Sequence, residues 1–188
     1  MQGPMLWVVA AAGLLLIGGV IYGYNRLVFN RARVAAAWSD IDVQLKRRSS
    51  LIPQLVDTLK AYTAYESSTL AALTAQRSKA QQQEAGSATE RSVTEGQLSA
   101  ALKHVLATVE NYPELKADGG FLNLQQNLSE VEGHIQMARR YYNGAVRELN
   151  VLVESVPTNL LAKAFAFQTA AYFSLDDAGD AESPKMEF

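Results

Sequence analysis

Apolar residues form one long uninterrupted run near the start of this chain. Residues 5–22 carry no charge and are almost all apolar. Because an α-helix rises about 1.5 Å per residue, roughly 18 to 20 such residues cross a hydrocarbon core of about 30 Å. The run therefore predicts an N-terminal transmembrane anchor, which we assign to residues 1–24. Its anchor residues are Leu6, Trp7, Gly13, Leu16, Gly18, Gly19 and Tyr22.

After this run, apolar residues recur at alternating steps of three and four. The first such stretch contains Val34, Trp38, Ile41, Leu45, Ile52, Leu55, Leu59 and Tyr62, with Arg48 in its one polar place. A second stretch covers residues 98–112 and a third covers residues 121–156. This spacing puts one narrow apolar stripe on each helix, as in helical bundles and coiled coils. We predict an all-α fold, in which the transmembrane helix precedes an antiparallel bundle of three long helices and one short C-terminal helix.

Turn-forming residues mark the ends of these predicted helices. Residues 81–89 are polar and of low complexity, so they form either a frayed helix end or the turn between the first two long helices. Pro113 ends the second helix, because proline disfavours helical geometry in the residue before it. Pro157 ends the third, and a short fourth helix is expected from Leu160 to about Phe173. The bundle domain is then residues 25–173, and residues 174–188 form an acidic tail that we expect to be disordered.

Pro53 lies inside the first periodic stretch. The apolar spacing continues across it, which favours a kinked but continuous helix. The alternative is a real break, after which Ser49 or Ser50 caps a new helix.

The charges that flank the apolar run predict the orientation of the anchor. No Lys or Arg precedes the run, whereas Arg26, Arg31 and Arg33 follow it. The positive-inside rule places the N-terminus outside and the bundle in the cytoplasm, as a single-pass protein of the cell (inner) membrane. A cleaved signal peptide is disfavoured, because there is no basic region before the run and no small-residue cleavage site after it.

Composition excludes several functional classes. The chain has 17 basic and 19 acidic residues, so it lacks the basic face of a nucleic-acid-binding protein. It has no cysteine, and its two histidines, His104 and His134, do not have the Glu-x-x-His spacing of a di-metal bundle. There is no nucleophile elbow and no phosphate-binding loop. We therefore predict no enzymatic activity, no cofactor, no bound metal and no small-molecule substrate.

The densest cluster of charged residues lies on the first long helix. It contains Asp40, Asp42, Lys46, Arg47 and Arg48. Asp42 and Lys46 are neighbours on a helix surface, so the cluster is either a solvated helix face or a contact with a partner or another subunit. Arg48 differs from the others because it falls on the apolar stripe.

A buried arginine at that place needs a carboxylate partner. The candidates on other helices are Glu110, Glu132 and Glu154. Such a pair would fix the helix register rather than carry out catalysis.

Several ordered blocks of residues resemble the LemA family. These blocks are residues 24–28, 38–48, 51–56 and 110–117, then Tyr142 with Asn143, and residues 157–159. The similarity extends over nearly the whole chain, up to Phe173. The resemblance implies a bacterial, membrane-anchored helical bundle for which no enzymatic activity is defining. A magnetosome-associated member of the family suggests a role in membrane organisation.

The chain departs from the family pattern at one place. Where the family often repeats Tyr-Asn, one heptad after Tyr142 and Asn143, this chain has Leu149 and Asn150. The remaining candidates for an interaction or structural role are Tyr24, Asn25, Trp38, Pro53, Tyr142, Asn143 and Asn159. For Tyr24, Asn25, Tyr142 and Asn143 the two interpretations are that they brace helices or that they bind a partner. Trp38 and Tyr142 are expected either in the core or in a ligand cage.

These observations lead to two hypotheses about function. In the first, the protein is a non-enzymatic, membrane-anchored bundle that organises or scaffolds a membrane-associated assembly by forming a homo-oligomer. Glycines of the span support this hypothesis, because small residues let membrane helices approach closely. In the alternative, it is a sensor or adaptor that regulates a partner membrane enzyme or signalling protein.

Overall fold

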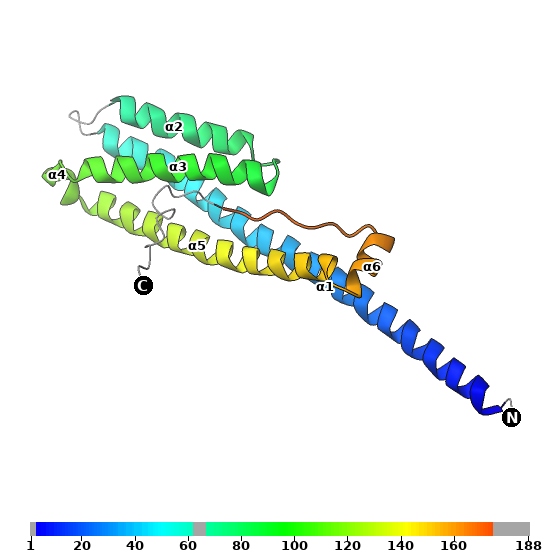
Figure 1. Ribbon diagram of the computed structural model, residues 1–188. Helices are drawn as coiled ribbons and strands as arrows, with labels where there is room; N and C mark the ends of the chain where they lie inside the picture. The colour runs from blue at the N-terminus through cyan, green and yellow to red at the C-terminus, as the bar shows by residue number, and fades with distance from the viewer. Residues whose placement is uncertain (1–2, 62–66, 175–188) are drawn as a thin grey trace, which may run out of the picture. The chain divides into compact units, whose positions relative to one another are not determined.

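The computed structural model describes residues 3–61 and 67–174, with side chains from Trp7 onward (Figure 1). Within these residues the chain forms six helices and no strand, so the predicted all-α class is confirmed. The helices are α1 (Gly3–Lys60), α2 (Ser67–Gln82), α3 (Ala88–Val109), α4 (Pro113–Lys116), α5 (Gly119–Glu154) and α6 (Thr158–Ala164). Apart from Ser174, the predicted acidic tail lies outside the described residues, as does Tyr62.

The chain divides into two compact units. Unit 1 combines Met1–Trp38 with Tyr141–Ala171, and unit 2 combines Ser39–Arg140 with Tyr172–Phe188. Both α1 and α5 contribute residues to each unit.

Helix α1 runs through Pro53 without interruption. The expectation of a continuous helix is met, and the alternative of a break after Ser49 or Ser50 is wrong. The Ser50 hydroxyl instead donates a hydrogen bond to the Arg47 carbonyl at 2.7 Å. Ile52 and Leu55, on either side of the proline, are fully buried, and their packing holds this stretch in the helix.

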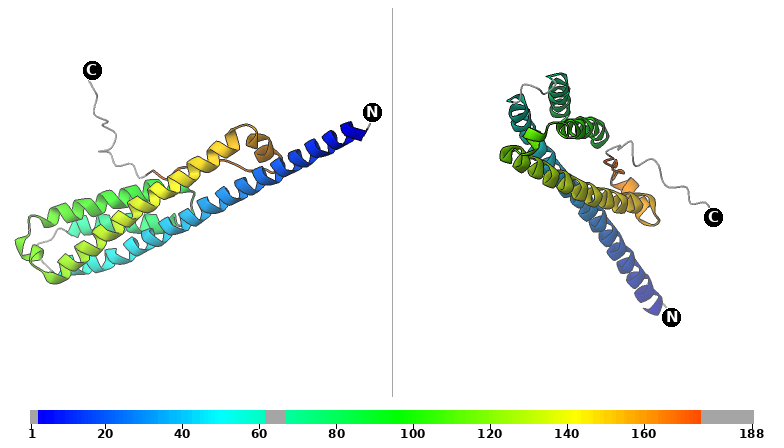
Figure 2. Two further views of the ribbon diagram at one scale, coloured as in Figure 1. Left: turned by 90° about the horizontal axis from the view of Figure 1, so that it is seen from below. Right: turned by 90° about the vertical axis from the view of Figure 1, so that its left-hand side faces the viewer.

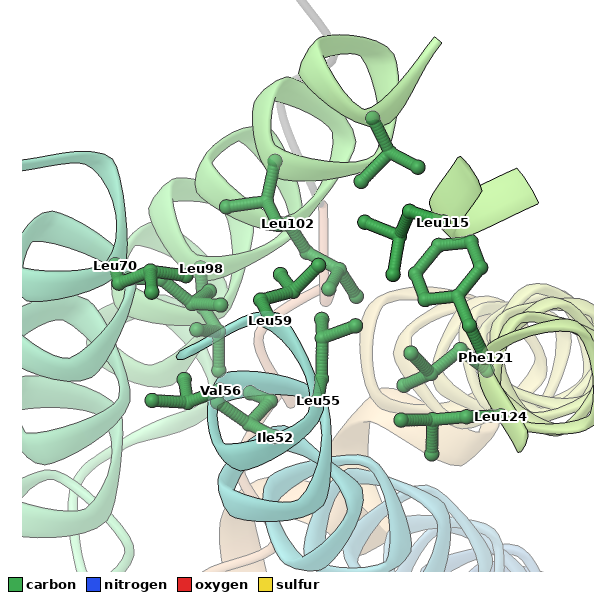
Figure 3. Packing of buried hydrophobic residues seen from close by; sticks show 14 of the residues in the cluster. Ile52, Leu55, Val56, Leu59, Leu70, Leu98, Leu102, Leu115, Phe121 and Leu124 are labelled. Carbon is green, nitrogen blue, oxygen red and sulfur yellow. The ribbon is translucent and has the colours of Figure 1, made fainter. Parts of the chain in front are cut away.

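Unit 2 is built around one apolar cluster (Figure 3). Its residues come from the C-terminal half of α1, from α2, α3 and α4, and from the beginning of α5. They are Ile52, Leu55, Val56, Leu59, Leu70, Leu73, Ala80, Leu98, Leu102, Val105, Val109, Leu115, Phe121, Leu124 and Leu128. In Figure 3, Leu55 and Leu59 of α1 lie between the labelled side chains of α3 and those of α5. The predicted apolar stripes thus form the core of this unit.

Helix α2 is separate from α1, whereas the sequence pattern predicted a single long helix before residues 81–89. The predicted turn within residues 81–89 exists, but it joins α2 to α3 rather than the first long helix to the second. Ser87 caps α3: its hydroxyl accepts a hydrogen bond from the Glu90 N–H at 3.3 Å, while the Glu90 carboxylate accepts one from the Ser87 N–H at 2.8 Å. This capping box satisfies two backbone N–H groups at the start of the helix.

Unit 1 packs α6 and the residues after it against α1 and the end of α5 (Figure 2). Its core contains Leu27, Leu152, Ala162 and Phe167. The expectation that the last helix reaches Phe173 is wrong, because α6 ends at Ala164. Ala166 adopts a left-handed conformation with φ of 55°, and the Phe167 N–H donates to the Ala162 carbonyl at 2.9 Å. This is a Schellman motif, which stops a helix and reverses the chain.

Candidate functional site

The apolar segment of α1 is the first candidate functional feature. Among the described residues, α1 is the one helix that is long and apolar enough to cross a membrane, and only 6% of its most apolar 18-residue window is buried. Trp7, Leu16 and Tyr22 are all exposed. The backbone of Leu6 lies in α1, and its side chain is outside the described part. A Cβ added at Gly13, Gly18 or Gly19 would meet no atom within 4 Å, so the protomer leaves these positions open.

A close contact follows at the end of this segment. A Cβ added at Gly23 would lie 2.6 Å from Cδ1 of Leu161, so α6 rests directly on α1 where Gly23 lacks a side chain. Next to it, Tyr24 packs edge-on against Phe165 and Phe167, with ring centroids 4.8 and 5.9 Å away. Tyr24 therefore braces α6 and the turn after it, whereas its neighbour Asn25 is exposed.

Two side chains of α5 hold residues 167–171, a non-helical segment that we call the strap. The Tyr142 hydroxyl donates a hydrogen bond to the Ala171 carbonyl at 2.9 Å. The Asn150 amide donates to the Ala170 carbonyl at 3.0 Å and accepts from the Ala170 N–H at 2.8 Å. Asn150, the asparagine of the incomplete Tyr-Asn repeat, therefore binds the strap, while Leu149 beside it is buried.

The structure places the other aromatic and amide candidates within unit 1. Trp38 stacks at a tilt on Tyr142, with ring centroids 5.3 Å apart, so these two rings lie in one packed contact. Burial raises the pKa of the Tyr142 hydroxyl. Asn143 is half-buried on α5, and Asn159 lies in α6, where its N–H donates to the Ser155 carbonyl.

A basic pocket of about 420 Å³ also lies in unit 1, and sequence reasoning missed it. Its lining residues are Tyr22, Arg26, Phe29, Asn30, Arg33, Arg147, Glu148, Val151 and Leu152. Arg33 pairs with Glu148 at 2.6 Å, and its guanidinium lies 5.9 Å from the centre of the Tyr141 ring. The signal for this pocket in the sequence is the set of arginines just after the apolar run, the same residues that predict the orientation of the anchor.

Unit 2 contains the second candidate feature, a buried network around Arg48. This side chain is 0% exposed. Its Nη1 donates to both carboxylate oxygens of Glu132 at 3.1 Å and to the Ser99 hydroxyl, and its Nη2 donates to the Glu95 carboxylate. Ser99 in turn donates to Glu132 at 2.9 Å.

Of the three carboxylates expected for Arg48, only Glu132 is its partner. Glu110 and Glu154 are exposed. Glu95 was missed, although the apolar stripe that starts at Leu98 reaches it when extended backward by three residues. Burial raises the pKa of the Glu95 carboxyl, against the opposing charge of Arg48.

A second buried arginine, Arg91, extends the network. Its Nη1 donates to Asp42 at 2.8 Å, and the other carboxylate oxygen of Asp42 accepts from Lys46 at 2.8 Å. Burial tends to raise the pKa of Asp42, but its bonds to Lys46 and Arg91 outweigh burial and lower it.

The predicted charge cluster on α1 thus separates into two groups. Asp42, Lys46 and Arg48 bond within the chain, whereas Asp40 and Arg47 are exposed, and Arg47 is 3.9 Å from Glu130.

The network joins α1, α3 and α5 through compensating charges. Three cationic groups, Arg48, Arg91 and Lys46, face three carboxylates. In the part of the chain that the structure describes, no group of three or more His, Cys, Asp or Glu side chains is arranged to hold a metal ion. The arrangement suits the fixing of helix positions, because each charge is already bonded to a neighbour.

The fold and these features define a class of protein: an all-α bundle that carries one apolar helix able to cross a membrane. The chain belongs to the LemA family, whose pattern matches residues 37–188.

Among curated proteins it is similar to magnetosome proteins MamQ 1 and MamQ 2 of Paramagnetospirillum magneticum. Each is 25% identical over 95% of this chain and 76% of the relative. It is also similar to protein LemA of Metamycoplasma hominis, with 26% identity over 87% of this chain and 76% of that protein.

Proposed function

We propose that this chain is a non-enzymatic, membrane-anchored helical-bundle protein that organises a membrane-associated assembly by self-association. The observation that carries the proposal is the apolar segment of α1, which the described chain leaves almost entirely uncovered. Such a surface is stable in lipid or against another apolar helix, and costly in water. The similarity to magnetosome proteins supports an assembly at a membrane.

The test of self-association is the mass of the full-length chain in mild detergent, measured by light scattering with the detergent contribution subtracted. We expect a multiple of the protomer mass of 20.5 kDa. A protomer mass at micromolar concentration would rule out self-association through this chain alone.

Two variants of the apolar segment test whether Gly19 itself lies at a contact between the spans of two chains. A cysteine introduced at Val20 in this cysteine-free chain reports contact between spans through disulfide formation. We expect Gly19→Leu to reduce that disulfide, because it fills an open position. Ala10→Leu is the matched control, since nine residues place it on the opposite side of the helix. Equal effects of the two variants would remove Gly19 from the contact.

We also propose that the N-terminus lies outside the cell membrane and the bundle in the cytoplasm, with the anchor in residues 1–24 and the bundle in residues 25–173. A cysteine in place of Gln83, in the exposed turn between α2 and α3, is probed with an impermeant thiol reagent. Labelling only after lysis supports this orientation, and labelling of intact cells reverses it.

A groove of about 350 Å³ in unit 2 favours the alternative, an adaptor for another membrane protein. It is lined by Asp40, Val43, Gln44, His134, Met137 and Ala138. Val43 and Met137 are exposed, and the Gln44 side-chain oxygen is buried without a hydrogen-bond partner in the described residues. Exposed apolar side chains beside an unpaired polar atom are typical of a surface that a partner protein covers.

A photo-crosslinking amino acid at Val43 distinguishes the two functions in cells. Cross-linking to a second copy of the chain supports self-association. Cross-linking to one different protein, absent when the probe stands at exposed Gln125, supports the adaptor.

A further inference from the structure

The basic pocket of unit 1 has more positive charge than its own residues neutralise. It is lined by Arg26, Arg33 and Arg147 but by a single acidic residue, Glu148. Glu148 is already paired with Arg33 at 2.6 Å. Among the described residues, Arg26 and Arg147 have no carboxylate within ion-pair distance, and both are exposed. The pocket therefore has two arginines available for an anion.

The position of Arg26 along α1 relates the pocket to the surface of a membrane. From Trp7 to Arg26 the helix rises about 28 Å, close to the thickness of a hydrocarbon core. Trp7 and Tyr22 then fall where interfacial aromatic residues are common. If the apolar segment spans the bilayer, the guanidinium of Arg26 lies at the level of the lipid phosphates.

The end of unit 1 has a second feature suited to that level. Around α6, Val156, Leu160 and Phe165 are 79%, 66% and 52% exposed. Because Leu161 of the same helix touches Gly23 at the end of the apolar segment, these side chains lie near the depth of Tyr22. Exposed apolar residues beside a span are favourable in the interfacial region of a bilayer and unfavourable in water.

The lining of the pocket offers two kinds of contact. Guanidinium groups bind phosphate oxygens through paired, charge-assisted hydrogen bonds. Tyr22, Phe29 and Val151 supply apolar surface beside these groups. This combination matches a molecule in which a phosphate is joined to an apolar chain.

We propose that this pocket binds the phosphate of an anionic phospholipid headgroup, with Arg26 and Arg147 as its ligands. The proposal rests on the membrane anchoring proposed above, because only an anchored chain holds the pocket at the lipid surface. A lipid rather than a soluble phosphate is favoured by the depth of Arg26 and by the exposed apolar residues around α6.

Native mass spectrometry of the full-length protein in mild detergent tests the proposal. Phosphatidylglycerol and phosphatidylcholine with the same acyl chains are added in equal amounts. We expect phosphatidylglycerol adducts to exceed phosphatidylcholine adducts about tenfold. Arg26→Gln and Arg147→Gln should each reduce this preference, and the double variant should abolish it.

Arg140→Gln is the matched control. It removes the same charge from an exposed position of α5 that does not line the pocket, so the preference should remain. Helical circular dichroism of each variant before the measurement confirms that it is folded.

Three results would overturn the lipid site. They are equal binding of the two lipids, an undiminished preference in the double variant, and displacement of phosphatidylglycerol by millimolar inorganic phosphate, which would assign the pocket to soluble phosphate. The same spectra report oligomer mass, so a missing lipid preference in an intact oligomer rejects only the lipid site. A protein that stays dispersed after detergent removal would instead reject the anchoring.

Discussion

The two units of this protein use arginine in opposite ways. In unit 2, Arg48 and Arg91 are buried and bonded to carboxylates from other helices. In unit 1, Arg26 and Arg147 remain exposed at a pocket whose one carboxylate is already paired. The same residue type, on helices with the same apolar period, thus has two outcomes that depend on which carboxylates lie opposite it.

This difference separates structural charge from charge that is available to a ligand. When a buried ion network is complete, removal of any one charged side chain strongly lowers the free energy of unfolding, because the remaining charges stay buried without a partner. An uncompensated arginine at the surface contributes little to folding, and its charge can act on a molecule outside the chain. Unit 2 should therefore respond to charge substitutions through stability, and unit 1 through binding.

The largest expected effect is that of Arg48→Ala. It leaves Glu95 and Glu132 without their cation, which should lower the free energy of unfolding by about 3–5 kcal/mol. Urea unfolding followed by circular dichroism in detergent measures this loss. Arg47→Ala, at an exposed position of the same helix, is the matched control, because the 3.9 Å pair of Arg47 with Glu130 should contribute at most about 1 kcal/mol.

Two further results would contradict this reading of the network. One is an equal decrease in the free energy of unfolding for Arg48→Ala and Arg47→Ala. The other is a large loss when Arg48, Glu95 and Glu132 are all replaced by apolar residues of similar volume, since removal of a complete buried network is often close to neutral.

The next largest effects compare the two apolar cores. Leu55 in unit 2 and Leu27 in unit 1 are both fully buried. Leucine-to-alanine substitutions in cores cost about 2–5 kcal/mol, depending on how far the surroundings collapse into the cavity. We expect Leu55→Ala near the upper end and Leu27→Ala near the lower end, because the unit 1 cluster has fewer buried members. Thermal unfolding of both variants checks the order, and the reverse order would contradict it.

A smaller effect is expected at the end of α6. Ala166 has a φ of 55°, a conformation that costs a non-glycine residue about 1–2 kcal/mol. Ala166→Gly should raise the free energy of unfolding by roughly 0.5–1 kcal/mol, after allowing for the greater freedom of glycine in the unfolded chain. Ala164→Gly, two residues earlier and still helical, should lower stability instead. A loss at both positions would show that the left-handed turn carries no strain.

The smallest effects are those of pH on two carboxyls of unit 2, and they should have opposite signs. The pKa of Asp42 is lowered below its ordinary 3.8, so its contribution is present above that pH and is lost as the pH falls through the folded-state value. The pKa of Glu95 is raised above its ordinary 4.5, so stability is lost as the pH rises from 4.5 through the folded-state value.

Unfolding free energies between pH 3 and pH 7 for the unmodified chain, Asp42→Asn and Glu95→Gln measure these slopes. The difference in unfolding free energy between the unmodified chain and Asp42→Asn should become smaller as the pH falls. The unfolding free energy of Glu95→Gln should not decrease above pH 4.5 in the way expected for the unmodified chain. Parallel curves for all three proteins would contradict both pKa directions.

The apolar period predicted the long helices because burial of one stripe is the main source of helix stability in bundles. It predicted that Arg48 needs a carboxylate and included Glu132 among the candidates. The apolar period did not indicate Glu95, because a glutamate in line with an apolar stripe cannot be distinguished by sequence from a glutamate on the solvent-exposed face. Only the identity of the residues opposite them decides which are buried.

Two other features have weak signals in the sequence. Helix α2 buries only Leu70, Leu73 and Ala80, so its apolar stripe is too sparse to stand out. The sequence does not indicate the end of α6, because Ala166 occupies the left-handed position at which a helix usually ends with glycine. The basic pocket combines residues from α1 and α5 that are more than a hundred positions apart, and no local pattern links them.

The pairing of Asn150 with the strap has a consequence for aggregation. Residues 165–171 contain two phenylalanines and no charged residue or proline, a composition that favours pairing between strands of different chains. Asn150 binds both the N–H and the carbonyl of Ala170, and Tyr142 binds the carbonyl of Ala171. These are the backbone groups that a neighbouring strand would need. The two α5 side chains therefore protect the folded chain from intermolecular β-pairing at a segment that would otherwise offer an open edge.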